Sequence, residues 1–176
     1  MAGDGLTSAT RRRLVHTLPS GKEIELEAIT VRDYAQIREQ ACKEYKRQFI
    51  ETFTLNADLL PLEKRATVAE DAFEKASKIT PDDLPKKEVA APDGKKVLLN
   101  YADWWMGMTV PGVLYSVWLS MRKNQPGLTQ ADVEKMFEDN FEAMHEAGDQ
   151  LADMSRPRLG NQDPAATKAG TTPSMV

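Results

Sequence analysis

An uncharged stretch decides the fold of this chain: Thr109-Val110-Pro111-Gly112-Val113-Leu114-Tyr115-Ser116-Val117-Trp118-Leu119-Ser120-Met121. Thr109 can cap a helix here, and Pro111 lies in the first turn, where a missing backbone N–H costs nothing. Apolar side chains recur at the i, i+3 and i+4 spacing of one helical stripe, namely Val110, Val113, Leu114, Val117, Trp118 and Met121. We therefore expect a helix that the rest of the domain buries.

The uncharged segment also raises the question of a membrane span. From Trp104 to Met121 there are eighteen residues without a charge, which is the length at which a transmembrane helix becomes a candidate. The Thr109 cap and Pro111 indicate, however, that the helix begins only there. Its length of roughly 22 Å, at 1.5 Å per residue, is short of the ~30 Å hydrocarbon core. We therefore expect a buried core helix and no contact with a membrane.

Beyond the break at 124–128, a second amphipathic helix is predicted from Thr129 to about Met154, with Thr129 and Asp132 as a capping pair. Its apolar stripe contains Val133, Met136, Phe137, Phe141, Met144, Leu151 and Met154. Four glutamates stand four residues apart along it and form what we call the acidic ridge: Glu134, Glu138, Glu142 and Glu146. The ridge is either a solvated face or a binding surface for a basic partner helix.

The chain begins with a predicted β-hairpin and a long helix. Residues 23–28 alternate charged and apolar side chains, and residues 14–18 supply the partner strand across a Pro19-Ser20-Gly21-Lys22 turn. Thr30 then caps the helix, with Asp33 at its third position. The apolar stripe of this helix contains Val31, Tyr34, Ile37, Ala41, Tyr45, Phe49 and Phe53.

The middle of the chain predicts one more helix, from about Pro61 to Ile79. Its inward face is expected to contain Leu62, Ala66, Ala69, Phe73, Ala76 and Ile79. The sequence Pro92-Asp93-Gly94-Lys95-Lys96-Val97 then repeats the pattern of the first turn. It indicates either a second short hairpin near 88–99 or the same turn chemistry used twice.

These elements predict a mainly α fold with a small N-terminal β-hairpin (α+β) and about four helices. We expect a flexible N-terminal arm at 1–13, a single helical domain at 14–154 and a disordered C-terminal tail at 155–176. The tail prediction rests on its many Pro, Gly, Thr and Ala residues and its few large apolar ones.

Composition and motifs argue against several functional classes. The net charge of −4 is too small to indicate nucleic-acid binding, and the single Cys42 excludes an intramolecular disulfide. His145-Glu146 is not followed by a second His at zinc-protease spacing, His16 is far away in sequence, and no phosphate-binding loop or nucleophile motif is present. We expect no catalytic residue, no metal ligand set and no cofactor, and therefore no enzyme.

Trp104 and Trp105 are the strongest candidates for a contact surface. Two adjacent tryptophans cannot both face the same interior on a regular element, so one of them is expected at the surface. Met106 and Met108 lie beside them as adaptable apolar side chains of the kind enriched at interfaces. The alternative is that both rings seal the junction between a loop and the helix that starts at Thr109.

Two stretches of the chain resemble the tail assembly chaperones of long-tailed bacteriophages. The first is Leu18-Pro19-Ser20-Gly21-Lys22-Glu23-Ile24-Glu25-Leu26-Glu27-Ala28-Ile29-Thr30, followed by a charged helix. The second is Val117-Trp118-Leu119-Ser120-Met121-Arg122-Lys123, followed by Pro126-Gly127-Leu128-Thr129-Gln130-Ala131-Asp132-Val133. The resemblance covers roughly residues 14–50 and 109–154, while the region from about 55 to 100 is larger than in that family.

The resemblance implies a non-enzymatic assembly factor in the cytoplasm of the host cell. Proteins of this family bind the long helical tape measure protein, keep it soluble and help bring tail tube subunits to it. Self-association would be a further contact. Partner-binding residues would be Trp104, Trp105, Met106 and Met108 together with the acidic ridge. The alternative is a structural subunit, such as a connector or tail component, that remains in the virion.

Overall fold

The computed structural model describes residues 12–91 and 94–155, and most of them are helical. The elements in chain order are β1 (Arg13–Thr17), β2 (Glu23–Glu27), α1 (Val31–Ala57), α2 (Leu62–Lys78), β3 (Lys86–Ala90), β4 (Lys96–Asn100), α3 (Tyr101–Met108), α4 (Val110–Met121), α5 (Gln130–Asp139) and α6 (Phe141–Ser155). The predicted mainly helical fold with an N-terminal hairpin is confirmed. The expected number of about four helices is wrong, because the described residues form six helices and two hairpins.

The predicted flexible arm and tail lie outside the described residues for the most part. Arg13, which we had placed in the arm, is the first residue of β1, and Ser155, which we had placed in the tail, is the last residue of α6. The Oγ of Ser155 accepts a hydrogen bond from the backbone N–H of Ile29 at 2.9 Å. Both residues therefore belong to the folded part of the chain.

The two hairpins are closed by the same turn. In the first, the N–H of Leu18 donates to the carbonyl of Lys22 at 2.8 Å, and in the second, the N–H of Ala91 donates to Lys95 at 2.7 Å. The glycine that each turn requires, Gly21 or Gly94, has a φ of 80° or 78°, which a residue with a Cβ rarely adopts. The repeated sequence pattern therefore marks two hairpins with one turn chemistry.

Helix α1 begins at the predicted cap. The Thr30 side chain accepts from the N–H of Asp33, whose carboxylate in turn accepts from the N–H of Thr30 at 2.8 Å. Lys123 lies 2.6 Å from the same carboxylate. Burial alone would raise the pKa of Asp33, but the hydrogen bonds from Lys123 and Thr30 outweigh burial and hold this pKa below its ordinary value. The cap thus also fixes α1 to the end of α4.

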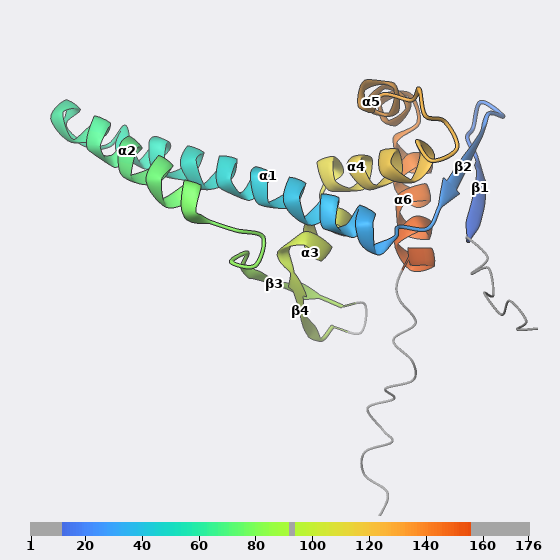
Figure 1. Ribbon diagram of the computed structural model, residues 1–176, viewed down its shortest axis with the longest axis horizontal. Coiled ribbons are helices and arrows are strands. Elements are labelled where there is room, and N and C mark those ends of the chain that lie inside the picture. Colours follow the sequence, from blue (N-terminus) through green and yellow to red (C-terminus); the bar gives the residue numbers. More distant parts are fainter. Residues whose placement is uncertain (1–11, 92–93, 156–176) are drawn as a thin grey trace, which may run out of the picture.

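Helix α2 folds back along α1, and Figure 1 shows the two helices extending together as an arm away from the rest of the molecule. The inward face that we predicted for α2 is confirmed at Ala76 and wrong at Leu62, Ala66 and Phe73. The buried residues are Ala72 and Ala76, whereas Leu62 and Phe73 are exposed. Small alanines let the two helices approach closely, and because α2 packs mainly against α1 among the described elements, its large apolar residues stay outside.

The core is arranged around α4. One cluster of buried side chains joins it to β2, α5 and α6, and a second cluster joins it to α1 and α3. Val117 and Leu119, two residues apart on α4, belong to the first and the second cluster respectively, and neither is exposed to solvent. The buried hydroxyl of Ser120 donates to the carbonyl of Glu27 at 2.6 Å and ties α4 to β2. The prediction of a buried core helix is therefore confirmed.

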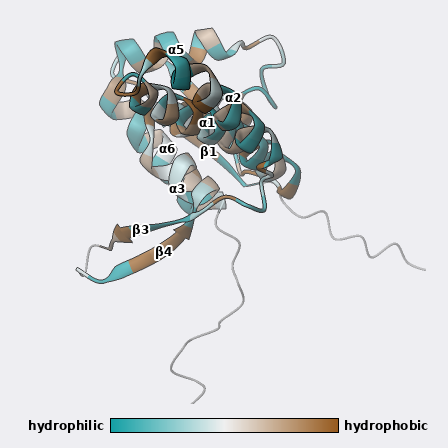
Figure 2. Ribbon diagram, turned by 90° about the vertical axis from the view of Figure 1, so that its left-hand side faces the viewer, coloured by the Kyte–Doolittle hydropathy of each residue, from teal (hydrophilic) through white to brown (hydrophobic). Residues whose placement is uncertain are grey.

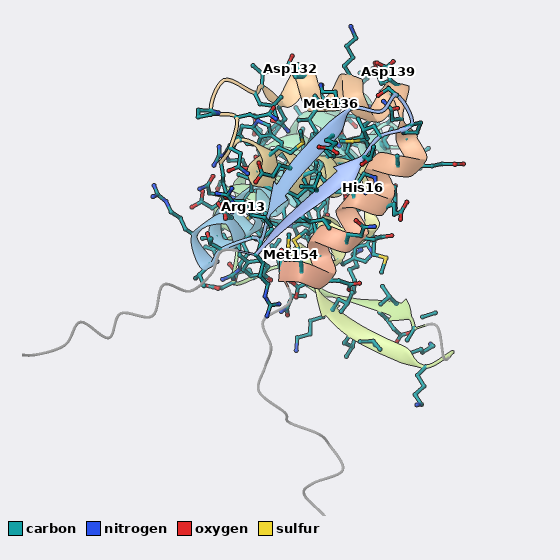
Figure 3. All side chains as sticks on the ribbon, turned by 90° about the vertical axis from the view of Figure 1, so that its right-hand side faces the viewer. Arg13, His16, Asp132, Met136, Asp139 and Met154 are labelled. Carbon is teal, nitrogen blue, oxygen red and sulfur yellow. The ribbon has the colours of Figure 1, made fainter. Side chains whose placement is uncertain are left out.

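Two helix boundaries differ from the prediction. The expected helix from Thr129 to Met154 is broken at Asn140, whose φ of −144° and ψ of 48° are not helical, so α5 and α6 can each turn apolar residues onto the core. Figure 3 shows α6 beside the β1–β2 hairpin, with α5 across its upper end. In addition, residues 101–108 form the helix α3, where we had expected a loop. On α1, the predicted stripe residue Val31 is exposed.

Candidate partner-binding surface

The four residues of the predicted Trp and Met cluster all lie on α3 but do not share one surface. Trp105 is only 2% exposed and packs in the second core cluster, with its ring centroid 6.0 Å from that of Tyr115. Its inclusion among the contact residues is wrong, because a partner could not reach it in this fold. Helix α3 directs Trp105 into the second core cluster, whereas Trp104, one residue before it, packs against that cluster and is only partly buried.

Trp104, Met106 and Met108 differ in how much of each side chain is accessible. Trp104 is partly buried under the side chain of Lys87, whose Nζ lies 4.9 Å from the centroid of the ring. Met106 is also partly buried against the second core cluster. Met108 is 59% exposed. Trp104 and Met108 are four residues apart on α3 and therefore offer the accessible part of the predicted cluster.

The acidic ridge is present but divided between two helices. Glu134 and Glu138 lie on α5, and Glu142 and Glu146 lie on α6, on the other side of the break at Asn140. All four are exposed, and among the described residues none of them forms an ion pair. Because the two helices differ in direction, a single straight basic helix cannot follow all four carboxylates. The ridge is better described as two adjacent acidic pairs.

Sequence reasoning missed the apolar end of the α1–α2 arm. Leu55, Leu59 and Leu62 lie where α1 gives way to α2 and are 70%, 85% and 83% exposed. We call these three residues the arm tip. Clusters of exposed large apolar side chains are characteristic of contact surfaces rather than of turns, which are usually polar. The signal in the sequence is the group of leucines around the helix break at 56–58.

A polar pocket lies near the start of α1, far from the arm tip. It lies between α1 and the segment before β3 and is lined by Tyr34, Arg38, Pro81, Asp82, Leu84, Asn100, Tyr101 and Ala102. Arg38 pairs with Asp82 at 2.6 Å and donates to the carbonyl of Pro81 at 3.0 Å. Burial and the hydrogen bond that its hydroxyl donates to Asp103 raise the pKa of Tyr34 above its ordinary value.

The histidines and the cysteine are not brought together. His16 is nearly buried on β1 with its Nδ1 3.3 Å from Oε1 of Gln150, His145 lies 3.6 Å from Asp149 on the surface of α6, and Cys42 is buried on α1. Within residues 12–91 and 94–155, no group of three or more His, Cys, Asp or Glu side chains is placed to hold a metal ion.

No helix in the described part of the chain combines the length and the apolar character that crossing a membrane requires. Comparisons with family models, with curated proteins and with solved structures found no match to this chain.

Proposed function

We propose that this protein is a tail assembly chaperone of a long-tailed bacteriophage, which binds the tape measure protein and helps recruit tail tube subunits. The proposal rests on the resemblance of residues 18–30 and 117–133 to that family. The fold is compatible with the role because it is mainly helical and its accessible apolar side chains lie on helices.

The structural observation that supports the proposal is the arm tip. Leu55, Leu59 and Leu62 are exposed at the end of a helical hairpin that extends away from the core, as Figure 1 shows. A tape measure protein presents apolar helical stripes, and an amphipathic helix is typically bound by apolar side chains spaced along a helical partner. We therefore assign the arm tip as the main apolar contact, with Trp104, Met106 and Met108 as a second one.

The acidic residues lie on α5 and α6, away from the arm tip, and form a separate part of the proposed contact surface. The exposed carboxylates of Glu134, Glu138, Glu142 and Glu146 favour a basic partner segment and steer its approach. Contacts through these residues should weaken as salt is added, whereas contacts through the arm tip should persist. This difference separates the two parts of the proposed surface experimentally.

The test is co-expression with the cognate tape measure protein, with the soluble yield of that partner as the measurement. The wild-type chain should raise the yield, and the triple variant L55S/L59S/L62S should lose most of this effect, because exposed apolar contacts on the partner would remain uncovered. The matched control is V15S/V31S, which removes two exposed valines that lie outside the arm tip, one on β1 and one at the start of α1. Each variant should keep the helical circular dichroism of the wild type.

Two results would overturn the proposal. One is an equal soluble yield of the tape measure protein with and without the wild-type chain. The other is the presence of this chain at a fixed copy number in purified phage particles, which mass spectrometry would detect. The second result would replace the chaperone by a structural subunit of the virion.

A further inference from the structure

The second hairpin has an unpaired edge. Strands β3 and β4 form a sheet of their own with only two strands, and Figure 2 shows this hairpin extending away from the helices, joined to them at its base. A two-stranded hairpin is marginally stable by itself, and the free N–H and C=O groups of an edge strand are ready to pair with another strand.

The two edges of this hairpin differ in chemistry. Strand β3 begins with Lys86, Lys87 and Glu88, and charged residues of this kind protect an edge from pairing. Strand β4 contains the consecutive apolar residues Val97, Leu98 and Leu99, of which Val97 is 42% and Leu98 64% exposed. Apart from Lys96, the residues of β4 are uncharged, so its edge is the less protected one.

The turn determines which backbone groups of β4 face this edge. The hydrogen bond from Ala91 to Lys95 makes these residues a hydrogen-bonded pair, and such pairs alternate with non-bonded ones along an antiparallel ladder. In the observed register, Val97 and Leu99 are therefore the residues whose backbone groups face β3. Lys96 and Leu98 direct their backbone N–H and C=O groups toward the open edge, and Asn100 directs its N–H there, while its carbonyl belongs to the N-cap of α3.

We propose that β4 pairs in antiparallel fashion with β4 of a second copy of this chain, with Leu98 of each copy opposite Leu98 of the other. This register is the one that pairs all five residues of the strand and brings together the residues whose backbone groups face outward. It places Lys96 opposite Asn100 of the second copy and Val97 opposite Leu99, so no like charges are opposed. Pairing of β3 with its own copy about Glu88 would instead oppose two carboxylates.

The result is a closed dimer rather than a growing sheet. The contact is the same on both copies and is related by a two-fold axis, which is the commonest symmetry of protein dimers. Its four strands are arranged β3-β4-β4-β3, so the outer edges are the two charged β3 strands. These edges stop further addition of strands. This inference does not depend on the proposed chaperone function.

A cysteine at position 98 tests the register. In a hydrogen-bonded antiparallel pair the Cα atoms are about 5.5 Å apart, within the range that a disulfide spans. Mild oxidation of Leu98→Cys should therefore give a covalent dimer on a non-reducing gel. Leu59→Cys, at the exposed arm tip, is the control and should form no covalent dimer on the same gel, and neither should the wild type, whose Cys42 is buried. Equal cross-linking of the two variants would overturn the proposed register.

Sedimentation over a range of protein concentrations tests the dimer itself. Wild type should pass from monomer to dimer, and Leu98→Lys should shift this equilibrium strongly to monomer, because it places two ammonium groups opposite each other. Leu59→Lys should leave the equilibrium unchanged. A wild type that stays monomeric throughout, a dimer that persists in Leu98→Lys, or a ladder of higher oligomers would each overturn the proposal. Far-UV circular dichroism checks that each variant is folded.

Discussion

Gly112 lies where α3 and α4 meet, and the backbone of α3 leaves no room for a side chain there. A Cβ at this position would lie 1.8 Å from the carbonyl oxygen of Trp105 and 2.5 Å from its carbonyl carbon. Both of these are backbone atoms, so the contact could be relieved only by moving α3 away from α4. The close approach also seats Trp105 in the second core cluster. One residue without a side chain thus determines how the two central helices meet.

We expect Gly112→Ala to lower the free energy of unfolding by about 1–3 kcal/mol, the usual cost of overpacking in a core. Gly107→Ala is the matched control, because no atom lies within 4 Å of the Cβ it would add and alanine favours a helix over glycine by about 1 kcal/mol. Denaturant unfolding of both variants measures the difference. A Gly112→Ala protein as stable as wild type would show that the α3–α4 corner is not held as described.

At the level of single elements, the predictions that succeeded rest on local chemistry. Thr30 with Asp33, and Thr129 with Asp132, form the predicted capping boxes at the starts of α1 and α5. Gly21 marks the turn of the first hairpin, as predicted. Each of these signals lies within a few residues of sequence and does not depend on what the element packs against. The starts of helices and the positions of turns could therefore be predicted from the sequence.

The errors concern features that depend on the rest of the fold. The spacing of apolar residues through Asn140 fits one continuous helix, but only a break there lets both halves reach the core around α4. The side of α2 that faces α1 is selected by the small Ala72 and Ala76 rather than by Phe73. The same holds for the candidate site, because the burial of Trp105 follows from the packing of α3 on α4. The periodicity of apolar residues shows which face of a helix is apolar, but it does not show which element packs against that face.

The arm predicts unequal stability among the helices. Helix α2 packs mainly against α1 and buries two alanines, whereas α4 buries Gly112, Val113, Leu114, Ser116, Val117, Leu119, Ser120 and Met121. Because local opening is easiest where few apolar contacts are lost, backbone amides of α2 should exchange with deuterium much faster than those of α4. Hydrogen exchange followed by mass spectrometry of peptides from the two helices measures this. Equal protection would mean that the arm is stabilised by contacts outside α1.

At the scale of the whole molecule, α4 connects two apolar clusters that share no other buried helix. Leu151 on α6 belongs to the first cluster and Leu119 to the second, and Trp118 and Ile29 pack against both. Disruption of either cluster removes one of the two surfaces that bury α4. We therefore infer that the clusters unfold together, as is usual for a single domain of this size.

Leu151→Ala and Leu119→Ala test this coupling. Both side chains are almost completely buried, so each substitution should cost about 2–5 kcal/mol through lost burial and a residual cavity. Trp104 and Trp105 pack in or against the second cluster and Trp118 packs against both, so fluorescence reports mainly on the second cluster, while far-UV circular dichroism reports on all helices. With coupled clusters, Leu151→Ala shifts the denaturant midpoints of both signals equally, although Leu151 lies in the other cluster. Leu59→Ala, at the exposed arm tip, should change stability by less than about 0.5 kcal/mol. A Leu151→Ala protein with a lowered circular dichroism midpoint and an unchanged fluorescence midpoint would show two independent units.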